Sequence, residues 1–207
     1  MFENKPDHTG RGPSAPPAAT LAHAASAAAE TASPLGKAGA LPPMVAFVGH
    51  SGSGKTTFVE QLIALLTDQG VRVAVIKHDL HGFEMDKPGK DTWRHKKAGA
   101  IATLISSPNK IGLVMDSGRD HTPEELLPLL HVADLVITEG YKRSNLPKIE
   151  IFRPDATGDK APLRLQDPNL LALIADTDVK TDLPVFATAD VAGVADFVRE
   201  RFLPPAD

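Results

Sequence analysis

The sequence contains no cysteine, and this absence excludes several kinds of site. Disulfide bonds, thiolate metal ligands and cysteine nucleophiles all require that side chain. Aromatic residues are also scarce, with one tryptophan and one tyrosine among 207 residues. No apolar run approaches the roughly 18–20 residues that a membrane-spanning helix needs. We therefore expect a cytoplasmic protein without a membrane segment.

Positive charge is not in excess either. The chain has 26 acidic and 22 basic residues, which gives a formal net charge of −4. Proteins that bind nucleic acids through one face usually carry a basic excess, so we expect no nucleic-acid partner. The hydrophobic fraction of 42% is enough for one sizeable folded domain.

The first 43 residues differ in composition from the rest of the chain. They are rich in alanine, proline, glycine, serine and threonine, and large apolar side chains are few. Such a segment buries too little apolar surface to offset the entropy lost on ordering. We predict a disordered extension over residues 1–43 and a folded domain over residues 44–207. Because Met44 directly precedes the first predicted strand, translation from near Met44 is an alternative to Met1.

A phosphate-binding loop is the strongest motif in the chain. Residues 49–56 read G-H-S-G-S-G-K-T, which matches G-x-x-x-x-G-K-[ST] completely, between a short apolar run at 45–48 and a helical pattern. Backbone N–H groups of such a loop cradle phosphates, the lysine reaches the β- and γ-phosphates, and the threonine hydroxyl binds Mg²⁺. The predicted nucleotide-binding residues are Gly49, His50, Ser51, Gly52, Ser53, Gly54, Lys55, Thr56 and Thr57.

Apolar runs alternate with helical patterns along the rest of the chain. This alternation predicts an α/β fold, a three-layer P-loop NTPase with a mostly parallel sheet between helices. Period-two alternation at 148–152 predicts a half-exposed strand, and an exposed sheet edge there would suit a symmetric dimer. The expected strands are 45–48, 71–76, 101–105, 111–115, 135–138, 148–152, 170–175 and 184–187, with helices at 91–98, from 122, and at 190–202.

A magnesium ion held by Thr56 also needs a carboxylate nearby. Glu139 ends a predicted buried strand, as the Walker-B acid of P-loop proteins does, although pairing with a lysine is its alternative role. Asp86 lies beside Pro88 and Gly89, so it is either a metal ligand or a turn residue. The other acids weighed for this role are Asp79 and Asp91.

Three longer stretches together identify a family resemblance. Residues 76–100 read I-K-H-D-L-H-G-F-E-M-D-K-P-G-K-D-T-W-R-H-K-K-A-G-A, and residues 139–142 read E-G-Y-K. With the phosphate-binding loop, these motifs resemble the molybdopterin-guanine dinucleotide biosynthesis adaptor family, MobB, strongly over about residues 44–153. The resemblance implies a GTP-binding protein, usually a homodimer, that assists the guanylyltransferase joining GMP to molybdopterin, with at most weak GTPase activity.

Several polar residues are candidates for binding the pterin phosphate or the base. His78 and His81 can donate to phosphates when protonated. Basic side chains around the predicted helix at 91–98 are candidates for the pterin phosphate, although a solvated helix face is the simpler interpretation. Asp176 follows a buried strand, where it is either a guanine-reading acid or a turn residue. The remaining candidates of the pterin group are Lys90, Asp91 and Arg94.

Two other classes of function stay open at this stage. An ATP-dependent small-molecule kinase shares the loop, and a structural module would leave it empty. We recognise no arginine finger in cis and no water-positioning glutamine, so any hydrolysis should be slow; Arg119 is a candidate for acting in trans across a dimer.

Overall fold

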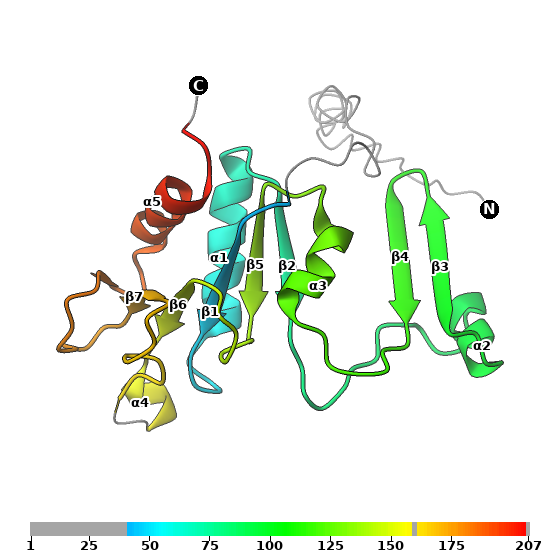
Figure 1. Cartoon of the computed structure of the whole chain (residues 1–207), viewed down its shortest axis with the longest axis horizontal. Coiled ribbons are helices and arrows are strands. Elements are labelled where there is room, and N and C mark those ends of the chain that lie inside the picture. Colours follow the sequence, from blue (N-terminus) through cyan, green and yellow to red (C-terminus); the bar gives the residue numbers. More distant parts are fainter. Residues whose placement is uncertain (1–40, 159–160, 206–207) are drawn as a thin grey trace, which may run out of the picture. The chain divides into compact units, whose positions relative to one another are not determined.

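A parallel β-sheet forms the centre of the folded domain in the computed structural model, which describes residues 41–158 and 161–205 (Figure 1). Most of the predicted extension, residues 1–40, lies outside the described residues. The sheet has six strands in the order β2-β5-β1-β6-β7-β8, and all neighbouring strands run parallel. The strands are β1 (Met44–Val48), β2 (Val73–Lys77), β5 (Leu135–Glu139), β6 (Lys148–Ile151), β7 (Leu170–Ile174) and β8 (Val185–Phe186).

Helices cover both faces of this sheet. Apolar side chains of α1 (Lys55–Asp68) and α5 (Val191–Phe202) pack with Phe47, Ile137 and Ile149 of the sheet in the main core. The opposite face packs with the 3₁₀ turn η1 (Leu127–Leu130), which directly follows the short helix α3 (Pro123–Leu126). The predicted three-layer α/β fold is therefore confirmed.

Two helices begin with the N-terminal caps that the sequence predicts. The Thr122 hydroxyl accepts from the Glu125 backbone N–H, and the Glu125 carboxylate accepts from the Thr122 N–H, so the two residues make a capping box at α3. Asp190 caps α5 by accepting from the Gly193 N–H at 2.9 Å. These caps depend on neighbours within a few residues, which is why the sequence reveals them.

The strands β3 (Ala102–Ser107) and β4 (Lys110–Met115) form a separate antiparallel hairpin and do not join the main sheet. Helix α2 (Asp91–Lys97) packs on β3, and Lys96 of α2 forms an ion pair of 2.6 Å with Asp116 after β4. One face of the hairpin carries exposed apolar side chains, which are Leu104, Ile111, Leu113 and Met115.

The prediction of a half-exposed edge strand at 148–152 is wrong. Strand β6 lies between β1 and β7, and every residue of it is buried. Its two charged side chains are buried because local loops satisfy them: Lys148 Nζ donates to two backbone carbonyls and pairs with Asp167 at 3.2 Å. Glu150 accepts from the backbone N–H groups of Leu163 and Arg164. The alternation of polar and apolar residues therefore reflects the two faces of a buried strand, not exposure to solvent. Because β6 pairs with β1 and β7, it has no free edge, and a dimer through this strand is excluded.

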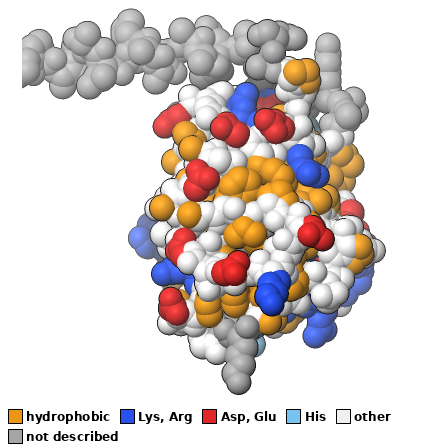
Figure 2. All heavy atoms as spheres, turned by 90° about the vertical axis from the view of Figure 1, so that its left-hand side faces the viewer, with side chains coloured by type: hydrophobic (Ala, Val, Ile, Leu, Met, Phe, Trp, Pro, Cys, Tyr) orange, Lys and Arg blue, Asp and Glu red, His pale blue; other side chains and the backbone are white. Residues whose placement is uncertain are grey.

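The surface beside α5 and β7 carries charges of both signs. Figure 2 shows acidic and basic side chains interspersed with apolar patches on this side of the molecule. The short helix α4 (Pro154–Thr157) follows β6. Among the described residues, none of the helices has the length and apolar character that crossing a bilayer requires.

Candidate nucleotide-binding site

The phosphate-binding loop connects β1 to α1 at the carboxyl edge of the sheet. Gly54, the N-cap residue of α1, has a left-handed φ of 86°, and no side chain caps the helix. Within the described part of the chain, the first N–H groups of α1 therefore have no intrahelical or capping side-chain acceptor and are open to an anion. They border a cavity of about 360 Å³ lined by Ser51, Gly52, Gly54, Lys55, Thr56, Thr57 and Glu139.

Lys55 lies folded over the loop. Its Nζ donates to the carbonyl oxygens of His50 at 2.6 Å and Gly49 at 3.2 Å. Burial lowers the pKa of Lys55, an effect that the nearby Glu139 carboxylate opposes and the Lys142 ammonium reinforces. A phosphate group would supply the full negative charge that these carbonyl oxygens lack.

Thr56 and Glu139 meet beside this cavity although they are 83 residues apart in sequence. The Thr56 hydroxyl donates to Glu139 Oε1 at 2.7 Å, and Lys77 Nζ lies 3.9 Å from the same oxygen. A hydroxyl and a carboxylate at the phosphate cavity are the donors that Mg²⁺ takes together with phosphate and water, so these residues fit the ion. No group of three or more histidine, aspartate or glutamate side chains in residues 41–158 and 161–205 is arranged to hold a metal.

Asp86, the other predicted metal ligand, has a different environment. Its Oδ1 accepts from the Lys87 backbone N–H at 2.9 Å and the Thr92 hydroxyl at 3.0 Å. These bonds tie the turn before α2 together. Within the described ranges the structure brings Asp86 into contact with neither Thr56 nor Glu139.

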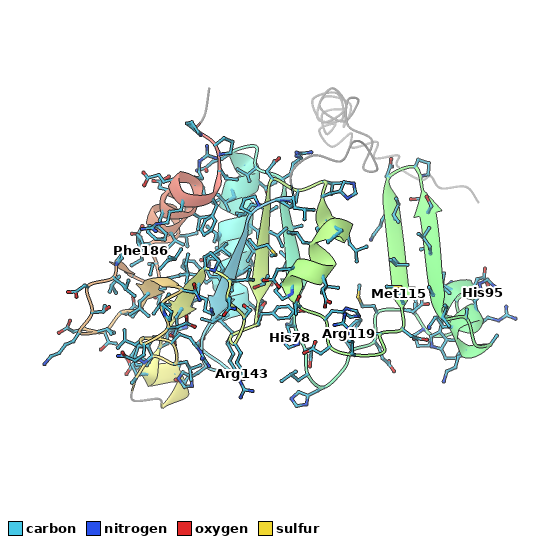
Figure 3. The ribbon with its side chains drawn as sticks, in the orientation of Figure 1. His78, His95, Met115, Arg119, Arg143 and Phe186 are labelled. Carbon is cyan, nitrogen blue, oxygen red and sulfur yellow. The ribbon has the colours of Figure 1, made fainter. Side chains whose placement is uncertain are left out.

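A second, larger cavity of about 1000 Å³ shares Ser51 and Lys55 with the phosphate cavity. Its walls come from residues 78–81 after β2, residues 120–124 before and within α3, and residues 140–145 after β5. His78 and Arg143, which line it, are labelled in Figure 3. Strand ends far apart in sequence thus meet at one edge, where ligands of parallel α/β sheets usually bind.

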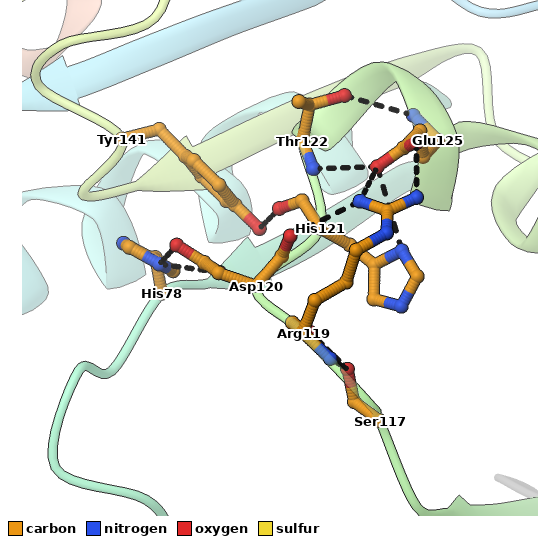
Figure 4. A network of polar contacts seen from close by, with 8 residues as sticks. All are labelled: His78, Ser117, Arg119, Asp120, His121, Thr122, Glu125 and Tyr141. Carbon is orange, nitrogen blue, oxygen red and sulfur yellow. Dashed lines mark hydrogen bonds and ion pairs between the residues drawn. The ribbon is translucent and has the colours of Figure 1, made fainter.

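His78 and Tyr141 form a stacked pair in the wall of this cavity. Their ring centroids lie 4.2 Å apart at 18°, and His78 Nε2 lies 3.0 Å from Asp120 Oδ1 (Figure 4). Tyr141 donates its hydroxyl to the His121 carbonyl at 2.9 Å. Burial, together with the carboxylates of Asp120 and Glu124, raises the pKa of Tyr141. The ring is therefore held neutral and in one orientation.

The backbone that presents Tyr141 is in an unusual conformation. Tyr141 has a φ of 48°, the left-handed region that residues with a side chain rarely adopt. The preceding Gly140 lies so close to His78 that a β-carbon there would be 3.1 Å from His78 Cβ. Such strained conformations persist where the surrounding structure holds them, and they cluster at ligand sites.

Arg119 is engaged within its own chain. Its guanidinium donates to both oxygens of Glu125, at 2.8 and 2.6 Å (Figure 4). This fork holds the pKa of Glu125 at about 2, with a smaller contribution from the Thr122 N–H. Arg119 would have to leave this pair to act on another subunit.

The predicted pterin-binding residues divide into two groups. His78 and His81 line the larger cavity. Lys90, Asp91 and Arg94 lie at the start of α2 and line neither cavity; Asp91 and Arg94 are exposed and 3.8 Å apart. The structure thus separates the basic cluster of α2 from both cavity linings.

Asp176, the predicted guanine-reading residue, follows β7 and lines neither cavity. It accepts from the Thr188 backbone N–H at 2.8 Å and from the Thr188 hydroxyl. These bonds lower the pKa of the Asp176 carboxyl, the hydroxyl contributing most. Asp176 therefore ties the loop after β7 to the loop after β8.

Sequence reasoning missed three residues that line the larger cavity, Asp120, Tyr141 and Arg143. The E-G-Y-K run at 139–142 contained a signal for the second of them. Asp120 lies in a loop with no motif, so only the fold brings it to His78.

Comparison with known proteins identifies the family. The sequence model described as "MobB: Molybdopterin guanine dinucleotide synthesis protein B" matches residues 44–176. The chain belongs to the MobB family. It is 36% identical over 167 residues to the molybdopterin-guanine dinucleotide biosynthesis adapter protein of Escherichia coli, covering 76% of this chain and 92% of that protein.

Two further MobB relatives agree in sequence and in fold. The adapter protein of Haemophilus influenzae is 32% identical over 158 residues, covering 75% of this chain and 87% of that protein. The crystal structure of Bacillus subtilis MobB superposes with a TM-score of 0.61 at 28% identity, covering 79% of this chain and 99% of that chain. The MobB match includes the whole phosphate-binding loop, Glu139 and the His78–Tyr141 pair.

Proposed function

We propose that this protein binds GTP with Mg²⁺ at its phosphate-binding loop and acts in the cytoplasm as an adaptor in molybdopterin guanine dinucleotide biosynthesis. Its partner in this role is the guanylyltransferase that joins GMP to molybdopterin. Membership of the MobB family and the adapter role printed for its relatives support the pathway. Weak GTP hydrolysis is the most that we expect of the chain alone.

One observation carries the nucleotide part of the proposal: an uncapped helix start, a lysine and a hydroxyl–carboxylate pair line a single small cavity. Each group suits one part of a nucleotide. The backbone N–H groups and Lys55 suit phosphate oxygens, and Thr56 with Glu139 suits Mg²⁺. The ion would neutralise charge on the β- and γ-phosphates.

Guanine recognition needs an acceptor for the N1–H and N2–H groups of the base. Asp176 stays our candidate for reading guanine, since it follows β7, which lies two strands from β1 and the phosphate-binding loop. Its carboxylate already accepts hydrogen bonds from Thr188. Reading guanine would require it to exchange one of these bonds. Asp176→Asn should then reduce the preference for GTP over ATP.

Molybdopterin, a phosphorylated pterin, suits the larger cavity. The flat His78–Tyr141 pair offers a wall for a heterocycle, and Lys142 and Arg143 bring positive charge for its phosphate. The volume of about 1000 Å³ is at the upper end of the usual range for small-molecule sites, roughly 300–1,000 Å³. Ser51 and Lys55 would then lie between the two ligands.

A homodimer is the assembly that we propose, now through the β3–β4 hairpin. A two-stranded hairpin is marginally stable in water unless something covers its apolar face. Leu104 and Met115 on that face are 63% and 59% exposed, and Leu113 lies opposite Leu104. An uncharged face of this kind is complementary to itself, as a two-fold interface requires. Leu104→Asp should give a monomer in sedimentation that still binds nucleotide; an unchanged dimer would reject this surface.

Calorimetric titration with GTP, ATP and Mg²⁺ tests the nucleotide proposal. Lys55→Ala should weaken GTP binding at least tenfold, because a charge-assisted contact is worth about 1.5–3 kcal/mol. The exposed hairpin lysine Lys110, changed to alanine, is the matched control. Binding of neither nucleotide would reject the proposal, and ATP binding with transfer of its phosphoryl group would favour the kinase alternative. Capture of the guanylyltransferase and pterin, with and without GTP, tests the adaptor role.

A further inference from the structure

Arg153 lies two residues after the end of β6, where that strand contacts the phosphate-binding loop. A β-carbon placed on Gly49 would lie 2.4 Å from the Ile151 carbonyl oxygen, so loop and strand are in direct contact there. A β-carbon placed on Gly54 would lie 3.1 Å from Nη1 of Arg153. The guanidinium therefore lies against the glycine that directly precedes Lys55.

The backbone of Arg153 is fixed while its side chain is exposed. Phe152 is buried and its N–H donates to the Ile174 carbonyl at 2.9 Å, which anchors the chain to β7. The Arg153 carbonyl accepts from the N–H groups of Ala156 and Thr157 in α4. The side chain is exposed, so it can adjust to a ligand without moving the sheet.

No acid in residues 41–158 and 161–205 forms an ion pair with this guanidinium. Other arginines of the chain are paired, as Arg72 is with Asp134 and Arg119 with Glu125. Asp176 lies near enough for Arg153 to contribute to lowering the pKa of its carboxyl, but Thr188 engages that carboxylate. Arg153 thus has no ion-pair partner within hydrogen-bonding reach in the described part of the chain, so its fork of donors is available for a phosphate at the neighbouring loop.

The sheet order indicates which part of a nucleotide Arg153 faces. Glu139 ends β5, on one side of β1, whereas Arg153 follows β6 on the other side and Asp176 follows β7 beyond it. A nucleotide whose γ-phosphate and Mg²⁺ lie beside Glu139 directs its α-phosphate and nucleoside toward β6 and β7. Lys55 and Thr56 suit the far end of the triphosphate, so a cationic side chain after β6 would face the nucleoside end.

We infer that Arg153 is a second cationic ligand of the bound nucleotide, which contacts the α-phosphate and holds the nucleoside end toward β7. This inference rests on the proposed nucleotide site and adds to it a residue that sequence reasoning overlooked. It makes Arg153 a binding and positioning residue. Because the contact does not involve the γ-phosphate, it serves GTP and GDP alike.

The test compares GTP and GDP affinity, measured by calorimetry, for wild type, Arg153→Ala and Arg153→Lys. Arg153→Ala should weaken both nucleotides by the same factor, about tenfold, which corresponds to about 1.4 kcal/mol. Arg153→Lys keeps the positive charge but loses the forked guanidinium, so its affinity for each nucleotide should lie between those of wild type and Arg153→Ala. Arg199→Ala is the matched control, because Arg199 lies on α5 and bonds Gln69.

Unchanged affinity of Arg153→Ala for both nucleotides would overturn the inference while leaving the proposed nucleotide site intact. A loss confined to GTP would also overturn it, because the contact would then be to the γ-phosphate. A wild type that binds neither nucleotide would instead reject the proposed function. Thermal unfolding without nucleotide should be the same for wild type and the two Arg153 variants, since Arg153 is exposed.

Discussion

Replacing Gly49 by alanine should reveal how tightly the phosphate-binding loop is held against the sheet. Gly49 has a φ of 145° and Gly52 a φ of 79°, both in the positive region that favours glycine. A β-carbon on Gly49 would lie 2.4 Å from the Ile151 carbonyl oxygen, whereas one on Gly52 would have no described residue within 4 Å other than its chain neighbours. Gly52→Ala is therefore a matched control, with backbone strain but no clash.

The expected losses of stability come from backbone strain in both variants and from a steric clash in Gly49→Ala. A positive φ costs a residue with a β-carbon about 1–3 kcal/mol, and both variants carry such a cost. Gly49→Ala must in addition push the loop or β6 aside, and overpacking of this kind costs about 1–3 kcal/mol more. β6 cannot yield easily because it pairs with β1 and β7 on its two sides. The difference between the variants should therefore be about 1–3 kcal/mol.

Thermal unfolding in the absence of nucleotide measures this difference. For a chain of this size each kcal/mol lowers Tm by roughly 2–4 °C, so Gly49→Ala should unfold about 2–12 °C below Gly52→Ala. Chemical denaturation gives the same comparison as a free energy. Equal melting temperatures for the two variants would refute the close approach of Gly49 to β6.

Two further predictions concern charged groups. Lys148→Met should destabilise the fold by about 3–5 kcal/mol in urea unfolding, because it leaves the mostly buried Asp167 without its counter-charge. The control, Lys142→Met at an exposed position, should change stability by less than about 0.5 kcal/mol. A loss that small for Lys148→Met would contradict the burial of the Lys148–Asp167 pair. The pKa of Glu125, held at about 2 by Arg119 against an ordinary 4.5, contributes stability that is present above pH 4.5 and lost as the pH falls toward 2. Wild type should therefore lose stability more steeply than Glu125→Gln over that pH range in acid unfolding, and identical profiles would show that the pair is inactive in solution.

Much of the site's chemistry could be predicted because it is local in sequence. The glycines of the phosphate-binding loop and its place at the start of α1 favour the observed turn, in which Gly54 has a left-handed φ. The same holds for the Thr122–Glu125 capping box and the Asp190 cap, whose partners lie three residues away. Glu139 was predicted from its position at a strand end, and it lies beside Thr56.

Contacts between distant segments could not be predicted in this way. Alternation at 148–152 was typical of a half-exposed strand, yet Lys148 and Glu150 are buried because loops elsewhere supply their partners. Asp120 contacts His78 and Arg153 lies against Gly54, and neither pair shares a sequence motif.

The amino-acid order by itself determined the glycine-rich turn before α1, the helix ends and the alternation of strands and helices, because each depends on dihedral preferences and hydrogen bonds within a few residues. Tertiary structure decided which strands became neighbours, and with them the burial of β6, the larger cavity and the position of Arg153. Strand order is chosen by the burial of apolar surface across the whole domain, and no window of sequence contains that sum.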